Sequence, residues 1–235
     1  MESVSAGYGK LQIINDISLE ANQNEVTVIV GPNGSGKSTL LKTISGLTTL
    51  YKGKISLDGK VLSGLPPHEI AKLGLAYLPQ TESVFTQLTV AENFKMAGYT
   101  IKTEDVASRL QESLEIFPQL RAYLRTKVQN LSGGERQMVA MTMAMLRKPK
   151  IIMFDEPTAN LAPKVATQVL KTVAGFAHDS KLGVVLVEQN ARRALEIGDK
   201  AYLLVSGRKV FEGGTKELLE HKELSKLYLG LKVEQ

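Results

Sequence analysis

The sequence contains no cysteine among its 235 residues. This absence excludes disulfides, thiolate metal sites and cysteine nucleophiles. Long apolar runs are missing as well: the longest, at 26–30, 151–154 and 184–187, are far shorter than the roughly 18 residues that cross a bilayer. No signal-peptide pattern opens the sequence. We therefore expect a chain that spans no membrane and works in the cytosol.

Concentrated charge is also lacking. The net charge is +5, but Lys and Arg are spread along the chain, which indicates a solvated surface rather than one that binds nucleic acid. The three histidines, His68, His178 and His221, are far apart and lack metal-ligand spacing. A content of 43% hydrophobic and 23% charged residues is ordinary for a globular protein with a buried core.

The short apolar runs have the pattern of buried parallel strands in an α/β sheet, because longer helix-compatible stretches separate them. The runs lead into glycines, into Asp155 and into Glu188 respectively. In such sheets ligands bind beyond the carboxyl ends of the strands, so we expect the active site there. Asp58-Gly59 and Ser206-Gly207 are turn signals that predict hairpins over 55–62 and 201–211.

Residues 91–146 have helical periodicity. Ala107, Leu110 and Leu114 follow it, as do the methionines at 138, 141 and 145, which we interpret as core packing rather than a ligand surface. The sequence thus predicts one domain over 1–235, in which 1–90 and 147–235 form one lobe and 91–146 an inserted helical subdomain.

The strongest motif is a phosphate-binding P-loop, which follows an apolar run and precedes a helix-compatible stretch from Thr39. Its glycines let backbone N–H groups face phosphates, Lys37 reaches the β and γ phosphates, and Ser38 offers a hydroxyl to Mg²⁺. The nucleotide-binding residues we expect are Gly31, Pro32, Asn33, Gly34, Ser35, Gly36, Lys37, Ser38 and Thr39.

The run at 151–154 delivers two adjacent carboxylates at its end. Behind a P-loop, Asp155 suits the Mg²⁺ shell and Glu156 suits activation of the attacking water. We expect ATP hydrolysis by in-line attack on the γ-phosphate, with ATP and Mg²⁺ as cofactors.

A second glycine cradle, Leu131-Ser132-Gly133-Gly134-Glu135, opens a helical stretch before Asp155. This segment resembles the signature motif of the ABC ATPase family, and the resemblance extends over essentially the whole chain. It implies a P-loop NTPase fold with a mostly parallel, RecA-like sheet, an antiparallel β subdomain and an inserted helical subdomain. It also implies that each ATP lies between the P-loop of one subunit and Ser132, Gly133 and Gly134 of another.

Further positions match the family one at a time. Tyr8 matches the aromatic residue that stacks on adenine, and Gln80 the glutamine that contacts Mg²⁺ and responds to the membrane partner. Two positions depart from the family: Ala162 replaces a common aspartate, and Gln189 stands where a histidine is usual. A glutamine can hydrogen-bond a γ-phosphate but cannot become a cation.

The segments Asn160-Leu161-Ala162-Pro163, Glu188-Gln189-Asn190 and Tyr228-Leu229-Gly230 resemble the LivF type of ATPase subunit in branched-chain amino acid importers. This implies a second, LivG-like ATPase, whether in a homo- or heterodimer, and separate transmembrane permease subunits, with the chain peripheral on the inner face of the cell membrane. Importers for urea or amides stay an alternative. Non-transport ABC ATPases stay a lesser one, because no long heptad run separates Lys37 from Ser132 and only one cassette is present.

Overall fold

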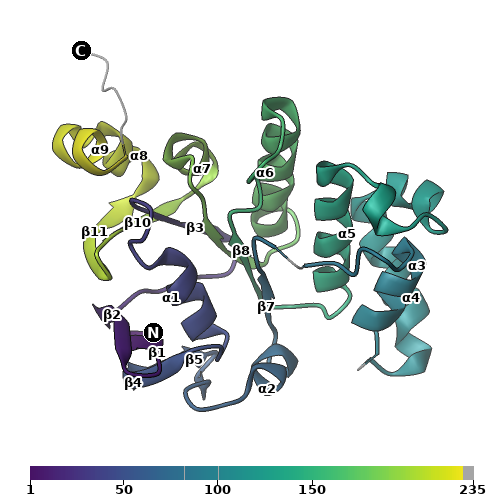
Figure 1. Cartoon of the computed structure of the whole chain (residues 1–235), viewed down its shortest axis with the longest axis horizontal. Helices are drawn as coiled ribbons and strands as arrows, with labels where there is room; N and C mark the ends of the chain where they lie inside the picture. Colours follow the sequence, from purple (N-terminus) through teal and green to yellow (C-terminus); the bar gives the residue numbers. More distant parts are fainter. Residues whose placement is uncertain (82, 100, 230–235) are drawn as a thin grey trace.

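The computed structural model describes residues 1–81, 83–99 and 101–229. Gly230, the last residue of the LivF-like segment Tyr228-Leu229-Gly230, lies outside the described residues. A six-stranded sheet runs through the centre of the molecule (Figure 1). Five strands are parallel and the edge strand β11 is antiparallel to β10. The order is β11 (Arg208–Gly214), β10 (Lys200–Val205), β3 (Glu25–Val30), β9 (Gly183–Val187), β8 (Ile151–Asp155) and β7 (Leu75–Leu78). The predicted mostly parallel sheet is confirmed.

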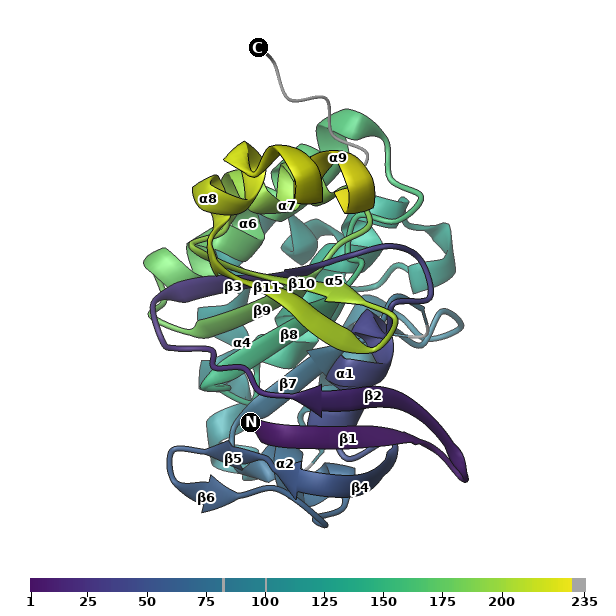
Figure 2. The same cartoon turned by 90° about the vertical axis from the view of Figure 1, so that its left-hand side faces the viewer.

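Helices cover both faces of this sheet, which explains why β3, β8 and β9 are apolar along nearly their whole length. Figures 1 and 2 show α1 (Lys37–Ile44) and α2 (Pro67–Lys72) on one side. The opposite side carries α6 (Pro163–His178), α7 (Ala191–Ile197), α8 (Thr215–Glu220) and α9 (Lys222–Leu229).

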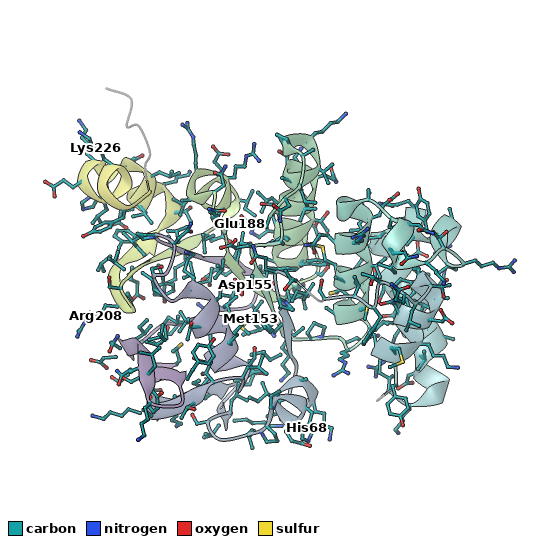
Figure 3. All side chains as sticks on the ribbon, viewed as in Figure 1. His68, Met153, Asp155, Glu188, Arg208 and Lys226 are labelled. Carbon is teal, nitrogen blue, oxygen red and sulfur yellow. The ribbon has the colours of Figure 1, made fainter. Side chains whose placement is uncertain are left out.

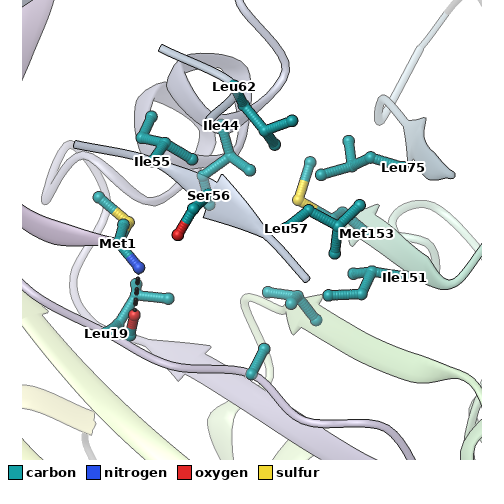
Figure 4. A pocket seen from close by; sticks show the side chains of 12 residues that line it. Met1, Leu19, Ile44, Ile55, Ser56, Leu57, Leu62, Leu75, Ile151 and Met153 are labelled. Carbon is teal, nitrogen blue, oxygen red and sulfur yellow. Dashed lines mark hydrogen bonds between the residues drawn. The ribbon is translucent and has the colours of Figure 1, made fainter. Parts of the chain in front are cut away.

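A second, antiparallel sheet lies beyond α1, in the order β2 (Leu11–Ile17), β1 (Glu2–Tyr8) and β4 (Thr49–Lys54) (Figure 2). The hairpin β5 (Ser56–Leu57) and β6 (Lys60–Val61) follows it. Between this layer and the central sheet is an apolar pocket that Ile44, Leu57 and Met153 help to line (Figure 4). The expected antiparallel β subdomain is therefore present, and α1 is packed between two sheets.

The helices from Val90 to Met145 lie at one side of the central sheet (Figure 1). They are α3 (Val90–Ala97), α4 (Thr103–Ile116) and α5 (Gly133–Met145), with 3-10 turns at Pro118–Tyr123 and Val128–Asn130. Met141 is buried, and Met138 and Met145 pack partly buried against the same core, so the predicted core role of these methionines is confirmed. In α4, Leu114 is buried but Ala107 is exposed.

Both predicted hairpins are confirmed, and one of them supports the P-loop. At each tip two successive residues have positive φ, Asp58-Gly59 and Ser206-Gly207, which is the backbone of a tight hairpin turn. The Gly207 amide donates to the Ser35 carbonyl at 3.0 Å, and the Gly207 carbonyl accepts from the Asn15 amide at 2.8 Å. The β10–β11 turn therefore holds the back of the P-loop against β2.

Among the described residues, none of the helices combines the length and the apolar character that crossing a membrane would require.

Candidate functional site

The P-loop joins the end of β3 to the start of α1. A Cβ on Gly31 would lie 2.0 Å from the carbonyl oxygen of Leu204 on β10, so only glycine fits at this position. Gly34 and Gly36 have φ of 76° and 101°, which lets the backbone curl ahead of the helix. The loop thus presents the first turn of α1, with its unpaired N–H groups, to an open cleft.

Lys37 is the first residue of α1 and is 5% exposed. Its Nζ donates to the carbonyl oxygens of Gly31 at 2.9 Å and Pro32 at 3.0 Å. Burial lowers the pKa of the ammonium, although the carboxylates of Glu156 and Asp155 act in the opposite direction. Because an ammonium has three donors, one beyond these two can reach a phosphate oxygen.

Ser35 gives a test of whether an anion fits the loop. Ser35 is 2% exposed. Among the described residues, its hydroxyl oxygen is the one buried side-chain polar atom without a hydrogen-bond partner. A buried hydroxyl without a partner destabilises a protein by about 1–3 kcal/mol. A phosphate in the curl of the loop would supply an acceptor beside it, so the residues present fit a nucleotide.

Asp155 ends β8 and has both carboxylate oxygens occupied. The Ser38 hydroxyl donates to Oδ1 at 2.8 Å, and the Tyr77 hydroxyl donates to Oδ2 at 3.0 Å. Burial raises the pKa of Tyr77, and Asp155 adds to that effect, so Tyr77 stays a donor at neutral pH. A hydroxyl and a carboxylate in contact are oxygen ligands of the kind that Mg²⁺ takes, so this pair fits the metal.

Glu156 follows Asp155 with φ of 50°, in a region that few non-glycine residues adopt. Its amide donates to the Val187 carbonyl at 2.9 Å, which ties the backbone at Glu156 to the end of β9. The Gln80 side-chain amide donates to Glu156 Oε2 at 3.0 Å. Strained backbone of this kind is often found at functional sites, where the surrounding structure maintains it.

An open cleft of about 550 Å³ connects these groups, a size that suits a small-molecule ligand. The exposed side chain of Gln189 lines it beside Glu156. The structure therefore brings together the P-loop, Glu156 and Gln189. The residues that line the cleft are Ile13, Asn33, Gly34, Gly36, Lys37, Ser38, Thr39, Glu156 and Gln189.

Tyr8 lies at the end of β1, 44% exposed. Within the described residues, Ile13 of β2, not Tyr8, lines the cleft. An exposed aromatic at the tip of the β1–β2 hairpin is free to lie over a base, but the structure itself does not bring Tyr8 into the cleft.

Ser132, Gly133 and Gly134 form a separate group at the start of α5, away from the residues that line the cleft among those the structure describes. Glu135 caps them: its Oε2 accepts from the Ser132 amide at 2.7 Å and from the Ser132 hydroxyl at 2.8 Å. These bonds lower the pKa of Glu135. Ser132 itself is exposed. One chain thus places its two glycine cradles at different sites.

Sequence reasoning did not single out Ile13 or Tyr77, and it placed Glu188 at the carboxyl end of a strand without giving it a role. Tyr77 and Glu188 each stand within three residues of a predicted site residue, which was the available signal. Their contacts depend on strand register, since Tyr77 is paired with Met153 across β7 and β8. A single sequence does not give that register.

Known proteins are similar to this chain in sequence and in fold. The family model described as ABC transporter matches residues 14–159. The chain is 51% identical to the probable branched-chain amino acid transport ATP-binding protein LivF of Archaeoglobus fulgidus, over 97% of each chain. It is 37% identical to the high-affinity branched-chain amino acid transport ATP-binding protein BraG of Pseudomonas aeruginosa, over 97% of this chain and 98% of that one. A dimeric ATP-binding cassette solved in a post-hydrolysis state with ADP and Pi superposes with a TM-score of 0.77 and 25% identity, over 91% and 97% of the two chains.

Proposed function

The chain belongs to the ABC transporter family as an ATP-hydrolysing subunit, and from that premise we propose that it energises a permease that imports branched-chain amino acids. The observation that supports the chemistry is the contact between Gln80 and Glu156 at the edge of a cleft that Lys37 also lines. The observation that supports the substrate is the 51% identity to LivF over nearly all of both chains.

In the proposed mechanism the residues at 31–39 bind the phosphates through backbone N–H groups and Lys37. Glu156 accepts the hydrogen bond of a water and orients it toward the γ-phosphate, while Gln80 keeps the carboxylate in place through the 3.0 Å contact. Gln189, which also lines the cleft, contributes a donor to the γ-phosphate or the water. These side chains position and stabilise charge, which is most of what phosphoryl transfer requires.

Ser38 and Asp155 would hold Mg²⁺. Gln80, whose side-chain amide donates to the adjacent residue Glu156, is the third metal ligand that we propose. The metal, when bound, neutralises charge on the β and γ phosphates. Ser38 and Asp155 are already within 2.8 Å of each other, so the protein does not need to bring these two ligands together. Tyr77 fixes the remaining carboxylate oxygen and thereby the orientation of Asp155.

We further propose that a second ABC ATPase subunit, LivG-like or another copy of this chain, completes the site. Ser132, Gly133 and Gly134 would then meet the nucleotide of that second subunit, because they lie outside the cleft of their own chain among the described residues. Tyr8 would stack on the adenine at the cleft's open side, because its ring is 44% exposed and therefore accessible to a base.

The permease would dock on a groove of about 350 Å³ between β7 and the helices α3 and α5. Two large apolar side chains that line the groove are exposed, Phe85 by 50% and Met96 by 48%, and neighbouring exposed apolar side chains of this kind fit a protein partner. Pro79 lines the groove and precedes Gln80, so a partner in the groove could act on the Gln80–Glu156 contact. The chain would thus work peripherally, on the inner face of the membrane.

Replacement of Glu156 by Gln tests the chemistry. We expect turnover of the assembled transporter to fall by roughly 10²–10⁴, since a positioned base is lost, while ATP affinity stays the same. ATP-bound dimers should then accumulate in gel filtration. Wild-type turnover in this variant would exclude Glu156 from the proposed role.

A further inference from the structure

Glu188 is a buried carboxyl group that the proposed chemistry does not use. It follows β9 and is 3% exposed, beside the exposed Gln189. Figure 3 labels it in the centre of the molecule near Asp155, where β8 and β9 end. Ionisable side chains are seldom buried to this degree without specific partners.

The partners of Glu188 come from the two segments that follow these strands. Its Oε1 accepts from the amide of Thr158 at 3.0 Å and from the hydroxyl of Thr158 at 2.7 Å. Its Oε2 accepts from the amide of Gln189 at 3.2 Å. One carboxylate therefore bridges the segment after Glu156 and the segment that carries Gln189.

This arrangement is costly for the fold. Burial raises the pKa of Glu188, the nearby Glu156 adds to that effect, and the three hydrogen bonds only partly oppose it. Since the folded pKa is raised, the stability that the protonated form gives is present below the ordinary value of 4.5 and is lost as the pH rises through the folded pKa. At neutral pH the buried charge therefore lowers stability, and the hydrogen bonds from Thr158 and Gln189 offset part of that cost.

The same segment continues to the signature helix of the same chain. Beyond Thr158, Asn160 has φ of 61°, and the chain then enters α6. A Cβ on Gly133 would lie 2.8 Å from Leu161 Cδ2, and one on Gly134 would lie 2.5 Å from Val165 Cγ1. The start of α5 is thus in close contact with the residues directly after the Glu188 bridge, and a shift of one must be met by the other.

We propose that Glu188 is a positioning residue that holds Gln189 and the 156–158 segment in one arrangement and links this chain's cleft to its own signature helix. The proposal rests on the proposed function of Glu156 and Gln189. Because α5 would serve the second subunit's nucleotide, the bridge connects the two ATP sites of a dimer.

The test compares three variants in the assembled transporter. Glu188→Gln keeps one oxygen for both Thr158 donors but replaces the acceptor of the Gln189 amide by an NH₂ group, which cannot accept. Glu188→Ala removes both links. Thr158→Val removes the hydroxyl contact alone and serves as the matched control for the other half of the bridge.

We expect kcat to fall about 10-fold in Glu188→Gln and further in Glu188→Ala, with the KM for ATP unchanged within about twofold. Thr158→Val should lose less, and the double variant Glu188→Ala/Thr158→Val should be no slower than Glu188→Ala, because both changes act on one bridge. Melting curves at pH 8 are recorded for each variant, because a purely structural role predicts that the losses of kcat follow the losses of heat stability.

Wild-type kcat in Glu188→Gln and Glu188→Ala would overturn the proposal, as would losses that follow thermal stability and ATP affinity together. Glu156→Gln is measured in parallel. If Glu156→Gln is inactive while the Glu188 variants equal the wild type, only the positioning role fails. If Glu156→Gln hydrolyses ATP normally, the proposed role of Glu156 fails. The proposal for Glu188 then fails with it, because Glu188 is proposed to position the segment that carries Glu156.

Discussion

Two helices of this chain begin at glycine-rich segments, and their first turns are organised in opposite ways. At α1 the residue before the helix is Gly36, which has no side chain to cap the amides, and Lys37 is buried. At α5 Ser132 is exposed and forms a capping box with Glu135, so the amides of Ser132 and Glu135 have acceptors within the start of the helix. The first cradle is left for a ligand, while the second is stable by itself.

This difference suggests different tasks. A helix start without a cap leaves N–H groups and partial positive charge for an anion. The hydroxyl of Ser35 in the same loop also lacks a hydrogen-bond partner among the described residues, and an anion would supply an acceptor for it. At α5 an incoming phosphate has to compete with the carboxylate of Glu135 for Ser132. The second cradle therefore should engage its anion only when another subunit presents it. The following predictions test that contrast, from the largest effect to the smallest.

Lys37→Ala should have the largest effect. Loss of a buried cation that contacts phosphates in both ground and transition states should weaken ATP binding by roughly 10–100-fold and lower turnover further. Calorimetry with ATP measures the first effect. Lys42→Ala, in the last turn of the same helix, is the control and should bind ATP as the wild type does.

Ser132→Arg should separate the two cradles. A bulky side chain at the start of α5 should leave ATP binding to the isolated chain within about twofold of the wild type, because Ser132 does not line the cleft among the described residues. Turnover of the assembled transporter should drop to background. Gln168→Arg on the exposed part of α6 is the control. Normal turnover in Ser132→Arg would rule out a shared site.

Substitutions of Gln189 test whether its side chain, which lines the cleft of the P-loop, takes part in hydrolysis. Gln189→Ala should lower turnover about 10-fold with little loss of ATP affinity, because the contact strengthens mainly as the γ-phosphate leaves. A glutamine does not titrate, so Gln189→His should add a pH dependence of turnover between about 6 and 8 that the wild type lacks. A pH–rate profile of the two proteins decides this. Full activity in the alanine variant would make Gln189 a bystander.

The smallest effect is expected at the cap of the second cradle. Glu135→Ala should destabilise the fold by about 1 kcal/mol, or about 2–4 °C in Tm. The hydrogen bonds from Ser132 lower the pKa of Glu135, so this contribution is present above the ordinary value of 4.5 and is lost as the pH falls through the lower folded value. Melting curves from pH 3 to pH 7 should show the two proteins converge in acid. A constant difference would contradict the cap.

The parts of this molecule that could be predicted from the sequence are those whose geometry is local. The strands β3, β8 and β9 are continuous apolar runs, and the turns at Asp58-Gly59 and Ser206-Gly207 have a two-residue signal. Residues 31–39 are one loop and one helix start, so their proximity follows from the chain itself. Within α4, periodicity predicted the helix, yet Ala107 is exposed, because a small residue does not define the buried face.

What could not be predicted depends on contacts between distant segments. The strands at Glu2–Tyr8 and Leu11–Ile17 have irregular register, which breaks the alternation that would indicate a strand. The Tyr77 hydroxyl reaches Asp155 only because β7 and β8 are adjacent, and Glu188 reaches Thr158 only because β9 ends beside β8. The roles of Tyr8 and Gln80 stay predictions that resemblance supplied.

The central claim is that the two cradles of one chain serve different nucleotides, and cysteine cross-linking tests it most directly. The chain has no cysteine, so Asn33→Cys and Ser132→Cys can be introduced together in the Glu156→Gln background without interference from other thiols of this chain. The assembled transporter would carry a second ATPase subunit with cysteine at the matching P-loop position. With ATP, the cysteine at 132 should form a disulfide with the second subunit, and without ATP it should not. A disulfide between positions 33 and 132 of the same chain, or no ATP-dependent link between subunits, would contradict the shared site.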